Sequence, residues 1–362
     1  MKLFAILFFL LPILGCTYVG WHIWQMLPFQ NIWKIVVLVA MFACLSLLFV
    51  CFMIGLDGMP LSCARIIYNV GTSSIFILLY LTMLFLVLDF GRLIYLVPTS
   101  FLKESVAGSF TVLGIMIAVF AYGNWHYYQK KRVQIDLHSS IPLDKPLEFV
   151  MMSDLHIGYH NTRKDLAQWV DLVNKENPDC ILIAGDIIDV SVKPVLEEDM
   201  SAEFKRLNAP VYACLGNHDY YAGEPNSEQF YRESGIKLLR DKSVLFNNEV
   251  VIIGRDDRTN PKRKNVSNLV KNASQGKFTI LLDHQPYHLE LAEKTGVNFQ
   301  LSGHTHYGQV WPINWIEDTL YEKAYGRHQR GNTHYYITSG IGIWGGKFRI
   351  GTQSEYVVCT IR

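Results

Sequence analysis

The sequence has almost no net charge. Its 33 lysine and arginine residues are nearly cancelled by 32 aspartate and glutamate residues, which leaves a formal charge of +1 over 362 residues. Proteins that bind nucleic acid place an excess of positive charge against the phosphate backbone, and this chain has no such excess. We therefore expect no nucleic acid partner.

Cysteine is scarce and odd in number, with seven residues in the chain. Three of them, Cys180, Cys214 and Cys359, belong to the C-terminal part and lie inside short apolar runs. This pattern is typical of reduced cysteines in a hydrophobic core and argues against a disulfide framework.

Charged residues are rare in the first third of the chain. Leu, Ile, Val, Phe and Met dominate before Trp125, whereas the residues after Lys130 have the mixed composition of a soluble domain. A chain of this length also exceeds what one core usually holds. We therefore divide it into a transmembrane region, residues 1–132, and a soluble domain, residues 133–362, joined by a short ordered connector over Gln134–Pro146.

Four apolar stretches reach the length of about 20 residues that a membrane-crossing helix needs. They are Leu3–Met26, Ile32–Ile54, Ser73–Val97 and Ala107–Tyr122. Trp and Tyr residues lie near their ends, where aromatic rings favour the headgroup region. We expect about four transmembrane helices. The first stretch, with Lys2 and Leu14-Gly15-Cys16, has a secretory or lipoprotein signal as its alternative, but it is long for a signal and Leu14 suits a lipobox poorly.

An even number of crossings places both ends of the region on one side of the membrane. The basic residues on that side are Lys2, Arg65, Lys130, Lys131 and Arg132, against Lys34 and Lys103 on the other. The positive-inside rule then predicts a multi-pass protein of the inner or plasma membrane with a cytoplasmic soluble domain. Few polar residues lie within the spans, so we expect an anchor rather than a transporter. Asp89 and Arg92 are interpreted as a snorkelling pair, with a small intramembrane site as the alternative.

After Lys145, a short apolar run ends five times in polar residues of metal-binding type. The runs are Leu147–Met152, Cys180–Ala184, Val211–Leu215, Phe278–Leu282 and Val297–Leu301, and the polar residues after them are Asp154, His156, Asp186, Asp189, Asn217, His218, Asp219, His284, His304 and His306. An amphipathic helix over Arg163–Asn177 separates the first two runs, which predicts a strand-helix-strand unit with parallel pairing. The strand ends therefore converge on one site.

The ligand chemistry of this set is carboxylate, imidazole and amide, without thiolate. Such a set suits Mn²⁺, Fe or Zn²⁺ in a catalytic site better than a structural zinc site. Its many acidic ligands suit two ions, which in such sites lie about 3.5 to 4 Å apart.

The ordered motifs resemble those of the calcineurin-like metallophosphoesterases over Phe149–Arg362. These motifs are D-x-H at Asp154, G-D-x-x-D at Gly185, G-N-H-D at Gly216, His284, and G-H-x-H at Gly303. The string Gly303–Val310 and the glycine-rich segment Ser339–Gly346 resemble the YkuE/YaeI-like branch, many of whose members are membrane-associated. Tyr307 departs from that branch, in which Gly commonly follows the second His.

This resemblance implies an α/β fold, an αββα sandwich of two mixed sheets with the site at the strand ends. We expect Val244–Ile253, Thr333–Ser339 and Tyr356–Ile361 to add strands to the second sheet. The resemblance also implies the ligand sets: Asp154, His156 and His306 for one metal ion, Asn217, His284 and His304 for the other, and Asp186 bridging both. Manganese is the expected metal, with iron or zinc as alternatives.

The resemblance further implies hydrolysis by direct attack of a metal-bridging hydroxide on phosphorus. His218 is expected to stabilise the transition state or protonate the leaving oxygen, Asp219 to orient His218, and Asp189 to support the ligands. His160, His288, His328 and His334 are expected to be surface or substrate-contact residues.

The hypothesis is a membrane-anchored hydrolase of phosphoesters or pyrophosphates, with a lipid-linked substrate such as a UDP-diacylglucosamine-like lipid A precursor. The alternatives are a phosphatase or phosphodiesterase for soluble nucleotides and an inactive metal-binding module of a membrane sensor. All the expected ligands are present, which argues against the inactive module. The basic loop Arg255–Lys264 either contacts phosphate or headgroups or is a solvated surface loop.

Overall fold

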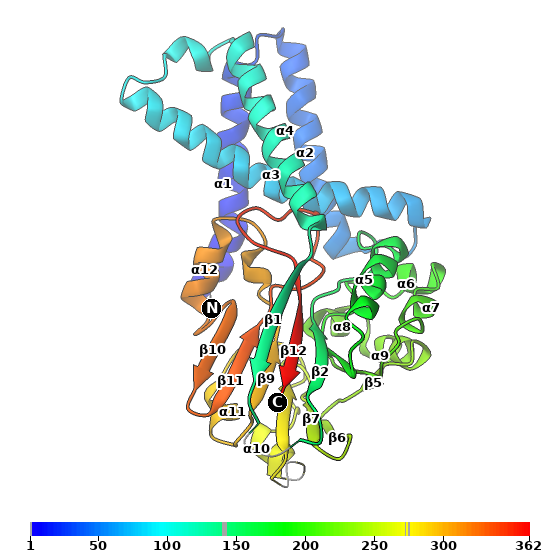
Figure 1. Cartoon of the computed structure of the whole chain (residues 1–362). Coiled ribbons are helices and arrows are strands. Elements are labelled where there is room, and N and C mark those ends of the chain that lie inside the picture. The colour runs from blue at the N-terminus through cyan, green and yellow to red at the C-terminus, as the bar shows by residue number, and fades with distance from the viewer. Residues whose placement is uncertain (1, 140–142, 272, 274–275) are drawn as a thin grey trace. The chain divides into compact units, whose positions relative to one another are not determined.

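The computed structural model of the chain forms two compact units (Figure 1). It describes residues 2–139, 143–271, 273 and 276–362, with side chains from Leu10 onward. One unit contains Met1–Trp125 with Gly345–Lys347, and the other contains His126–Trp344 with Phe348–Arg362. The division thus falls slightly before Val133, where we placed it from the sequence.

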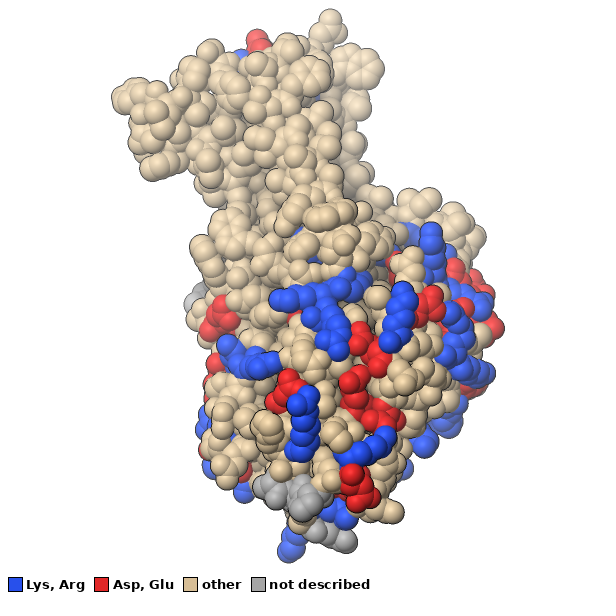
Figure 2. All heavy atoms as spheres, in the orientation of Figure 1, with Lys and Arg blue, Asp and Glu red and all other residues tan. Residues whose placement is uncertain are grey.

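The first unit is built from long helices. They are α1 (Lys2–Met26), α2 (Asn31–Phe49), which continues into the π-helical turn η1 (Val50–Ile54), α3 (Leu61–Leu93) and α4 (Val106–Tyr128), with the 3-10 turn η2 (Thr99–Leu102) before α4. Helix α3 contacts both α1 and α2. In the view of Figure 2 this unit shows very few charged side chains, and large apolar side chains such as Ile32, Val87 and Phe110 are exposed. An apolar exterior of this kind is what a lipid environment favours.

We expected four crossings, and the described residues contain three candidate membrane spans. The helices long and apolar enough to cross a membrane are Asn31–Ile54, Leu61–Leu93 and Val106–Tyr128. The expected first crossing forms α1, whose first residues lie outside the part of the chain with described side chains, so this crossing stays a prediction.

Helix α3 is longer at its start than expected, since it begins at Leu61 rather than at Ser73. In the structure, the Thr72 hydroxyl donates a hydrogen bond to the Tyr68 carbonyl and the Ser74 hydroxyl donates one to the Gly71 carbonyl. Their polar groups are satisfied by the helix itself, so they do not end it.

The second unit contains two six-stranded mixed sheets. The first has the order β1 (Lys131–Leu137), β12 (Glu355–Ile361), β2 (Leu147–Met152), β3 (Cys180–Ala184), β4 (Val211–Cys214), β5 (Lys237–Leu238). The second has the order β10 (Gly326–Arg330), β11 (Thr333–Ile337), β9 (Phe299–Ser302), β8 (Phe278–Leu282), β7 (Val250–Gly254), β6 (Lys242–Phe246). Strands β2, β3 and β4 are parallel, as are β7, β8 and β9, so each group ends at one edge of its sheet.

Three apolar cores separate four layers, which confirms the αββα sandwich. Side chains such as Phe149, Ile252 and Phe299 fill the space between the sheets. The outer face of the first sheet packs on α5 (Arg163–Lys175), α6 (Lys193–Glu197), α7 (Ser201–Phe204) and α9 (Glu224–Glu233). The outer face of the second packs on α10 (Val266–Lys271) and α11 (Glu290–Glu293). Cys180, Cys214 and Cys359 are buried and free, as predicted.

Three expectations about strands are corrected. Strand β12 belongs to the first sheet, because it pairs in parallel with β1 and antiparallel with β2. The start of the expected connector is strand β1, in which Ile135 and Leu137 are buried. The segment Val244–Ile253 is a hairpin of β6 and β7, because Asn247 and Asn248 adopt φ values of 47° and 58° and turn the chain between them.

Candidate metal centre

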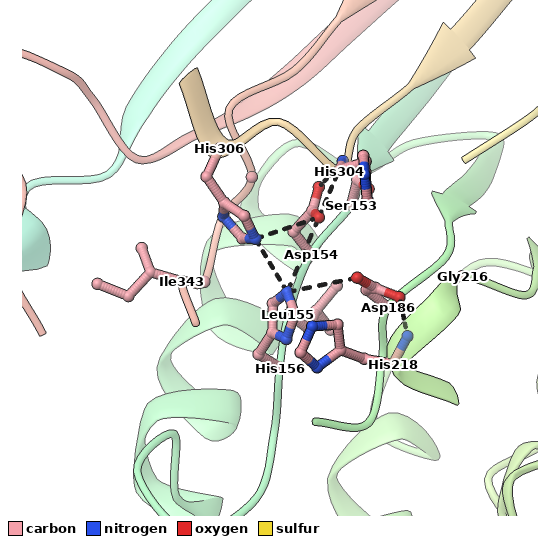
Figure 3. A network of polar contacts seen from close by, with 12 residues as sticks. Ser153, Asp154, Leu155, His156, Asp186, Gly216, His218, His304, His306 and Ile343 are labelled. Carbon is pink, nitrogen blue, oxygen red and sulfur yellow. Dashed lines mark hydrogen bonds and ion pairs between the residues drawn. The ribbon is translucent and has the colours of Figure 1, made fainter. Parts of the chain in front are cut away.

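The expected site residues come together where the parallel strands end. Asp154 and His156 follow β2, Asp186 and Asp189 follow β3, and Asn217 opens the short helix α8 (Asn217–Tyr221) after β4. From the second sheet, His284 follows β8, and His304 and His306 follow β9. Figure 3 shows Asp154, His156, Asp186 and His306 pointing toward one another. Two sheets thus supply ligands to one site.

Asp154, His156 and His306 form the first group, with one candidate ligand atom from each lying within 4.8 Å of the others. The Nε2 atoms of the two histidines are 3.0 Å apart, and Oδ1 of Asp154 lies 3.8 Å from His156 Nε2 and 3.5 Å from His306 Nε2. Two imidazole nitrogens and a carboxylate oxygen directed at one point are a donor set that divalent transition metals accept.

Asp186, His284 and His304 form the second group by the same measure. His284 Nδ1 hydrogen bonds to the Ala184 carbonyl at 2.7 Å, so Nε2 is directed to Asp186 Oδ2 at 3.1 Å. Among the described residues this buried Nε2 has no hydrogen-bond partner. The Oδ1 atom of Asn217 lies 2.8 Å from His304 Nδ1. A buried ring nitrogen that faces a carboxylate but makes no hydrogen bond fits a metal ion as a partner of both groups.

Asp186 lies between the two groups. Its Oδ2 atom is 3.6 Å from His156 Nε2 of the first group and 3.1 Å from His284 Nε2 of the second. Its Oδ1 atom accepts a hydrogen bond from the His218 backbone amide at 2.8 Å. The carboxylate is therefore held by the start of α8 in a position that reaches both groups.

The backbone around the site adopts conformations that side chains rarely take. Asp154, Asp186 and His304 have φ values of 56°, 53° and 72°. Non-glycine residues in this left-handed region cluster at functional sites. Gly303 has no room for a side chain, because a Cβ atom there would collide with Ser153 and with the Asp154 carboxylate. The candidate ligands therefore lie on backbone with positive φ values, which side chains rarely adopt.

The electrostatics favour ionised carboxylates. Burial by itself would raise the pKa of Asp186, but the charges of His284 and His218 hold it well below its usual range. Burial opposes the charge of His156, yet its contacts with Asp154 and Asp189 raise its pKa to about 10. Buried negative charge of this kind calls for a cation to compensate it. The residues present therefore fit divalent metal ions.

His218 lies at the rim of the site. Its side chain is 15% exposed, and its ring centroid is 4.5 Å from that of His156 in an edge-on arrangement. Its Nδ1 atom is 3.0 Å from Asp189 Oδ1. A partly exposed imidazole beside the ligands, with one nitrogen facing a buried carboxylate, can present its other nitrogen to a substrate.

The expected roles of the two supporting aspartates are corrected by their contacts. We expected Asp219 to orient His218, but Asp189 faces it, and Asp189 Oδ1 also lies 3.1 Å from His156 Nδ1. Asp219 instead accepts hydrogen bonds from the backbone amides of Asp186, Gly216 and Ile188. These amides open the two loops, so Asp219 fixes the backbone that carries Asp186.

Three further residues contact the site residues, and the sequence had not predicted these contacts. His160 is buried, with Nε2 hydrogen bonded to the Ile343 carbonyl at 2.5 Å and Nδ1 3.7 Å from Asp189 Oδ2. Arg349 is fully buried and donates to the carbonyl of His306 at 2.6 Å. Tyr231 donates to Asp219 at 2.9 Å. Only the position of His160, close after the D-x-H motif, was a usable signal.

Tyr307 occupies the position at which the related branch commonly has glycine. Its φ of 49° explains that preference, because glycine takes a left-handed conformation without strain. In this chain the Tyr307 ring stacks on Tyr325 with centroids 4.9 Å apart, and its hydroxyl donates to Asp318.

The basic loop Arg255–Lys264 is largely engaged within the domain. Arg255 and Arg263 both donate to the buried carboxylate of Asp283, at 2.9 and 3.1 Å. Arg258 differs, because it is exposed and its guanidinium lies 4.0 Å from the ring centroid of Tyr287. The loop is therefore neither a free phosphate clamp nor a fully solvated segment.

The comparisons with known proteins agree with this geometry. Residues 147–308 match the family described as calcineurin-like phosphoesterase. The chain is 29% identical over 261 residues to an uncharacterized metallophosphoesterase of Aquifex aeolicus, covering 69% of this chain and 98% of that protein. It is 31% identical over 282 residues to a transmembrane protein with metallophosphoesterase domain of Danio rerio, covering 70% and 63%. It is 29% identical over 283 residues to the uncharacterized metallophosphoesterase YkuE of Bacillus subtilis, covering 72% and 97%.

These matches confirm the resemblance seen in the motifs, including the relation to YkuE. The family uses a centre of two metal ions, and the two ligand groups described above are suited to hold them. Residues 147–308 therefore form a calcineurin-like metallophosphoesterase domain, the chain is a phosphoester hydrolase, and this domain follows a set of apolar helices.

Proposed function

We propose that this chain is a membrane-anchored two-metal hydrolase that acts on a lipid-linked phosphoester or pyrophosphate. The observation that carries the reaction class is the position of Asp186, whose Oδ2 atom lies within 3.6 Å of a histidine from each ligand group. The observation that carries the substrate class is the presence of three helices long and apolar enough to cross a membrane in the same chain.

In this proposal Asp154, His156 and His306 hold one ion, and Asn217, His284 and His304 hold the other. Asp186 is the ligand shared by both. Manganese is the metal we propose first, with iron or zinc as alternatives, because the donor set is carboxylate, imidazole and amide. When bound, the two ions supply an acidic water as nucleophile and positive charge against the transition state.

The remaining residues position these groups and move a proton. His218 is the group that we assign to the leaving oxygen, either as proton donor or as a charge that stabilises it. Asp189, 3.0 Å from its Nδ1 atom, keeps a proton on that side and turns Nε2 toward the substrate. Asp219 has an indirect role, because it holds the backbone amides of the loop that carries Asp186.

A row of side chains beside the site suits a substrate with a second anionic group. Tyr321 lies next to His304, with ring centroids 6.4 Å apart, and its hydroxyl is 2.9 Å from that of Tyr287. The exposed guanidinium of Arg258 lies over the Tyr287 ring. Aromatic faces followed by a guanidinium can hold a nucleotide or a second phosphate. This arrangement supports a pyrophosphate or a diester over a simple monoester.

The connection to the helices supports a substrate in the membrane. Helix α4 ends at Tyr128 and β1 begins at Lys131, so only Gln129 and Lys130 join them. A tether this short keeps the hydrolase domain near the headgroups. Lys130, Lys131 and Arg132 follow the last span directly, and we therefore propose a multi-pass protein with this domain in the cytoplasm. A UDP-diacylglucosamine-like lipid A precursor is the specific candidate, by analogy with related enzymes.

Hydrolysis by the full-length protein in lipid nanodiscs tests the proposal. The panel consists of nitrophenyl phosphate, bis-nitrophenyl phosphate, a soluble UDP-sugar and a UDP-diacylglucosamine-like lipid, with the Asp186→Asn variant as background. We expect kcat/KM to be highest for the lipid. A higher value for the soluble nucleotide would favour the soluble-nucleotide alternative, and no metal-dependent turnover of any compound would favour an inactive module.

A further inference from the structure

Helix α12 (Ile313–Leu320) presents large apolar side chains to solvent. Trp315, Ile316 and Leu320 are 61%, 54% and 54% exposed. Trp311, just before the helix, is 38% exposed and meets Trp315 edge to face with ring centroids 5.3 Å apart. We call these four residues the α12 apolar face. Contiguous exposed apolar groups of this kind on a soluble domain mark a surface that contacts something else.

The other side of α12 packs into the domain. Asn314 is buried, Glu317 is partly buried, and the helix contacts the 3-10 turn η3 (His306–Gly308). The backbone amide of Trp311 donates to the Ile350 carbonyl at 2.7 Å. Asp318 accepts a hydrogen bond from Tyr307, the residue after the ligand His306. The α12 apolar face is therefore fixed to the loop that carries a metal ligand.

The chemistry of the face suits a lipid surface. Trp, Ile and Leu are the side chains that bury themselves at the boundary between headgroups and acyl chains, and Trp prefers that depth. The chain itself brings a bilayer within reach, because its last apolar helix ends at Tyr128 and the domain's first strand begins at Lys131. Such a tether gives even a weak contact a high effective concentration.

We propose that the α12 apolar face inserts into the surface of the phospholipid bilayer that holds the chain and so keeps the His306 side of the metal centre at the membrane. The contact needs no particular substrate, so it stands apart from the substrate class proposed above. It adds a second attachment to the bilayer, made by the hydrolase domain itself.

Quenching of tryptophan fluorescence by brominated lipid tests this contact. The full chain is placed in nanodiscs of phosphatidylcholine, with or without bromine near the headgroup end of the acyl chains. The fluorescence of one tryptophan is obtained by subtracting the fluorescence of the variant in which that residue is Phe from the fluorescence of the unmodified chain. We expect the Trp315 signal to fall by half or more in brominated nanodiscs. The Trp169 signal should not change, because Trp169 is 3% exposed in the core of the domain.

Trp33, 59% exposed on α2 within a membrane-crossing helix, gives the positive control for quenching. If Trp33 is quenched and Trp315 behaves like Trp169, the proposal is overturned.

A second variant separates lipid contact from the general accessibility of Trp315. The double substitution Ile316→Ser and Leu320→Ser removes apolar groups from the face and should reduce the quenching of Trp315. The matched control is Leu196→Ser with Leu245→Ser, since these leucines are 53% and 44% exposed elsewhere on the domain. An unchanged Trp169 signal shows that each variant is folded. Undiminished quenching of Trp315 in the first variant would contradict the proposal.

Discussion

Oδ1 of Asp189 lies 3.0 Å from Nδ1 of His218 and 3.1 Å from Nδ1 of His156. One carboxylate oxygen thus faces both a candidate metal ligand and the candidate proton donor. Carboxylates behind ligating histidines fix the ring orientation and raise ligand basicity. In the mechanism proposed above, Asp189 therefore couples the binding of metal to the chemistry at the leaving oxygen.

Asp189→Asn is expected to weaken metal binding and turnover together. A loss of about 10- to 100-fold in metal affinity is typical when such a supporting group is removed. Metal titration of the apoprotein, followed by kcat at saturating metal, measures the two effects separately. Asp199→Asn, at an exposed position, is the control and should match the unmodified chain. Unchanged metal affinity in Asp189→Asn would refute the coupling.

Asp186→Asn is expected to lower turnover by several orders of magnitude and to reduce the bound metal, because one carboxylate serves both ligand groups. Elemental analysis of the purified protein gives the metal content, and hydrolysis of nitrophenyl phosphate gives the turnover. A variant with full metal content and undiminished turnover would rule out the shared-ligand assignment.

His218→Ala is expected to keep both metal ions and to lose activity by about 10²-fold or more, since a positioned acid acts mainly in the transition state. The loss should be larger for a substrate with a poor alkoxide leaving group than for a nitrophenyl ester. Kinetics on such a pair of substrates are the measurement. Equal losses on both would leave His218 a purely electrostatic role.

Glu317→Gln is expected to stabilise the protein at neutral and higher pH. Burial, with a further contribution from Asp318, raises the pKa of Glu317 from its ordinary value of 4.5 to about 7. Its Oε2 atom is buried and has no hydrogen-bond partner among the described residues. A carboxyl with a raised pKa favours folding while protonated, so its contribution is present below pH 4.5 and is lost as the pH rises through 7.

The melting temperature of the full chain and of Glu317→Gln, measured across this range, checks the expectation. The advantage of the variant should grow from pH 4.5 to 7 and then level off. Glu233→Gln, at an exposed position on α9, should show no such growth. An advantage independent of pH would show that charge on Glu317 is not its cause.

The sequence could predict which candidate residues lie together, because the information for this is local. Each ligand follows a short apolar run within a few residues, and parallel strands bring their ends together. The choice between Asp189 and Asp219 as the partner of His218 was not local. Both follow strand ends, and the two differ only in contacts with residues from other loops, since Asp189 faces His218 and Asp219 accepts from the amides of Asp186 and Ile188.

The fold shows the same division between local and distant information. The bounds of β2, β3 and β8 were predicted as the structure has them. The sheet to which β12 belongs was predicted wrongly, because its neighbours β1 and β2 lie far away in the sequence. Helix α12 was also missed, although Ile313, Ile316 and Leu320 have the spacing of an amphipathic helix.

The parallel pairing of β1 with β12 sets an order for biosynthesis. Lys131 pairs with Glu355 and Leu137 with Ile361, so β1 leaves the ribosome long before its partner exists. During that interval α4, just upstream, is available for insertion into the membrane, while the first sheet lacks the strand between β1 and β2. Domains generally fold as units during synthesis, and contacts between distant residues form late. The apolar helices are therefore synthesised, and available to a membrane, before the first sheet can close.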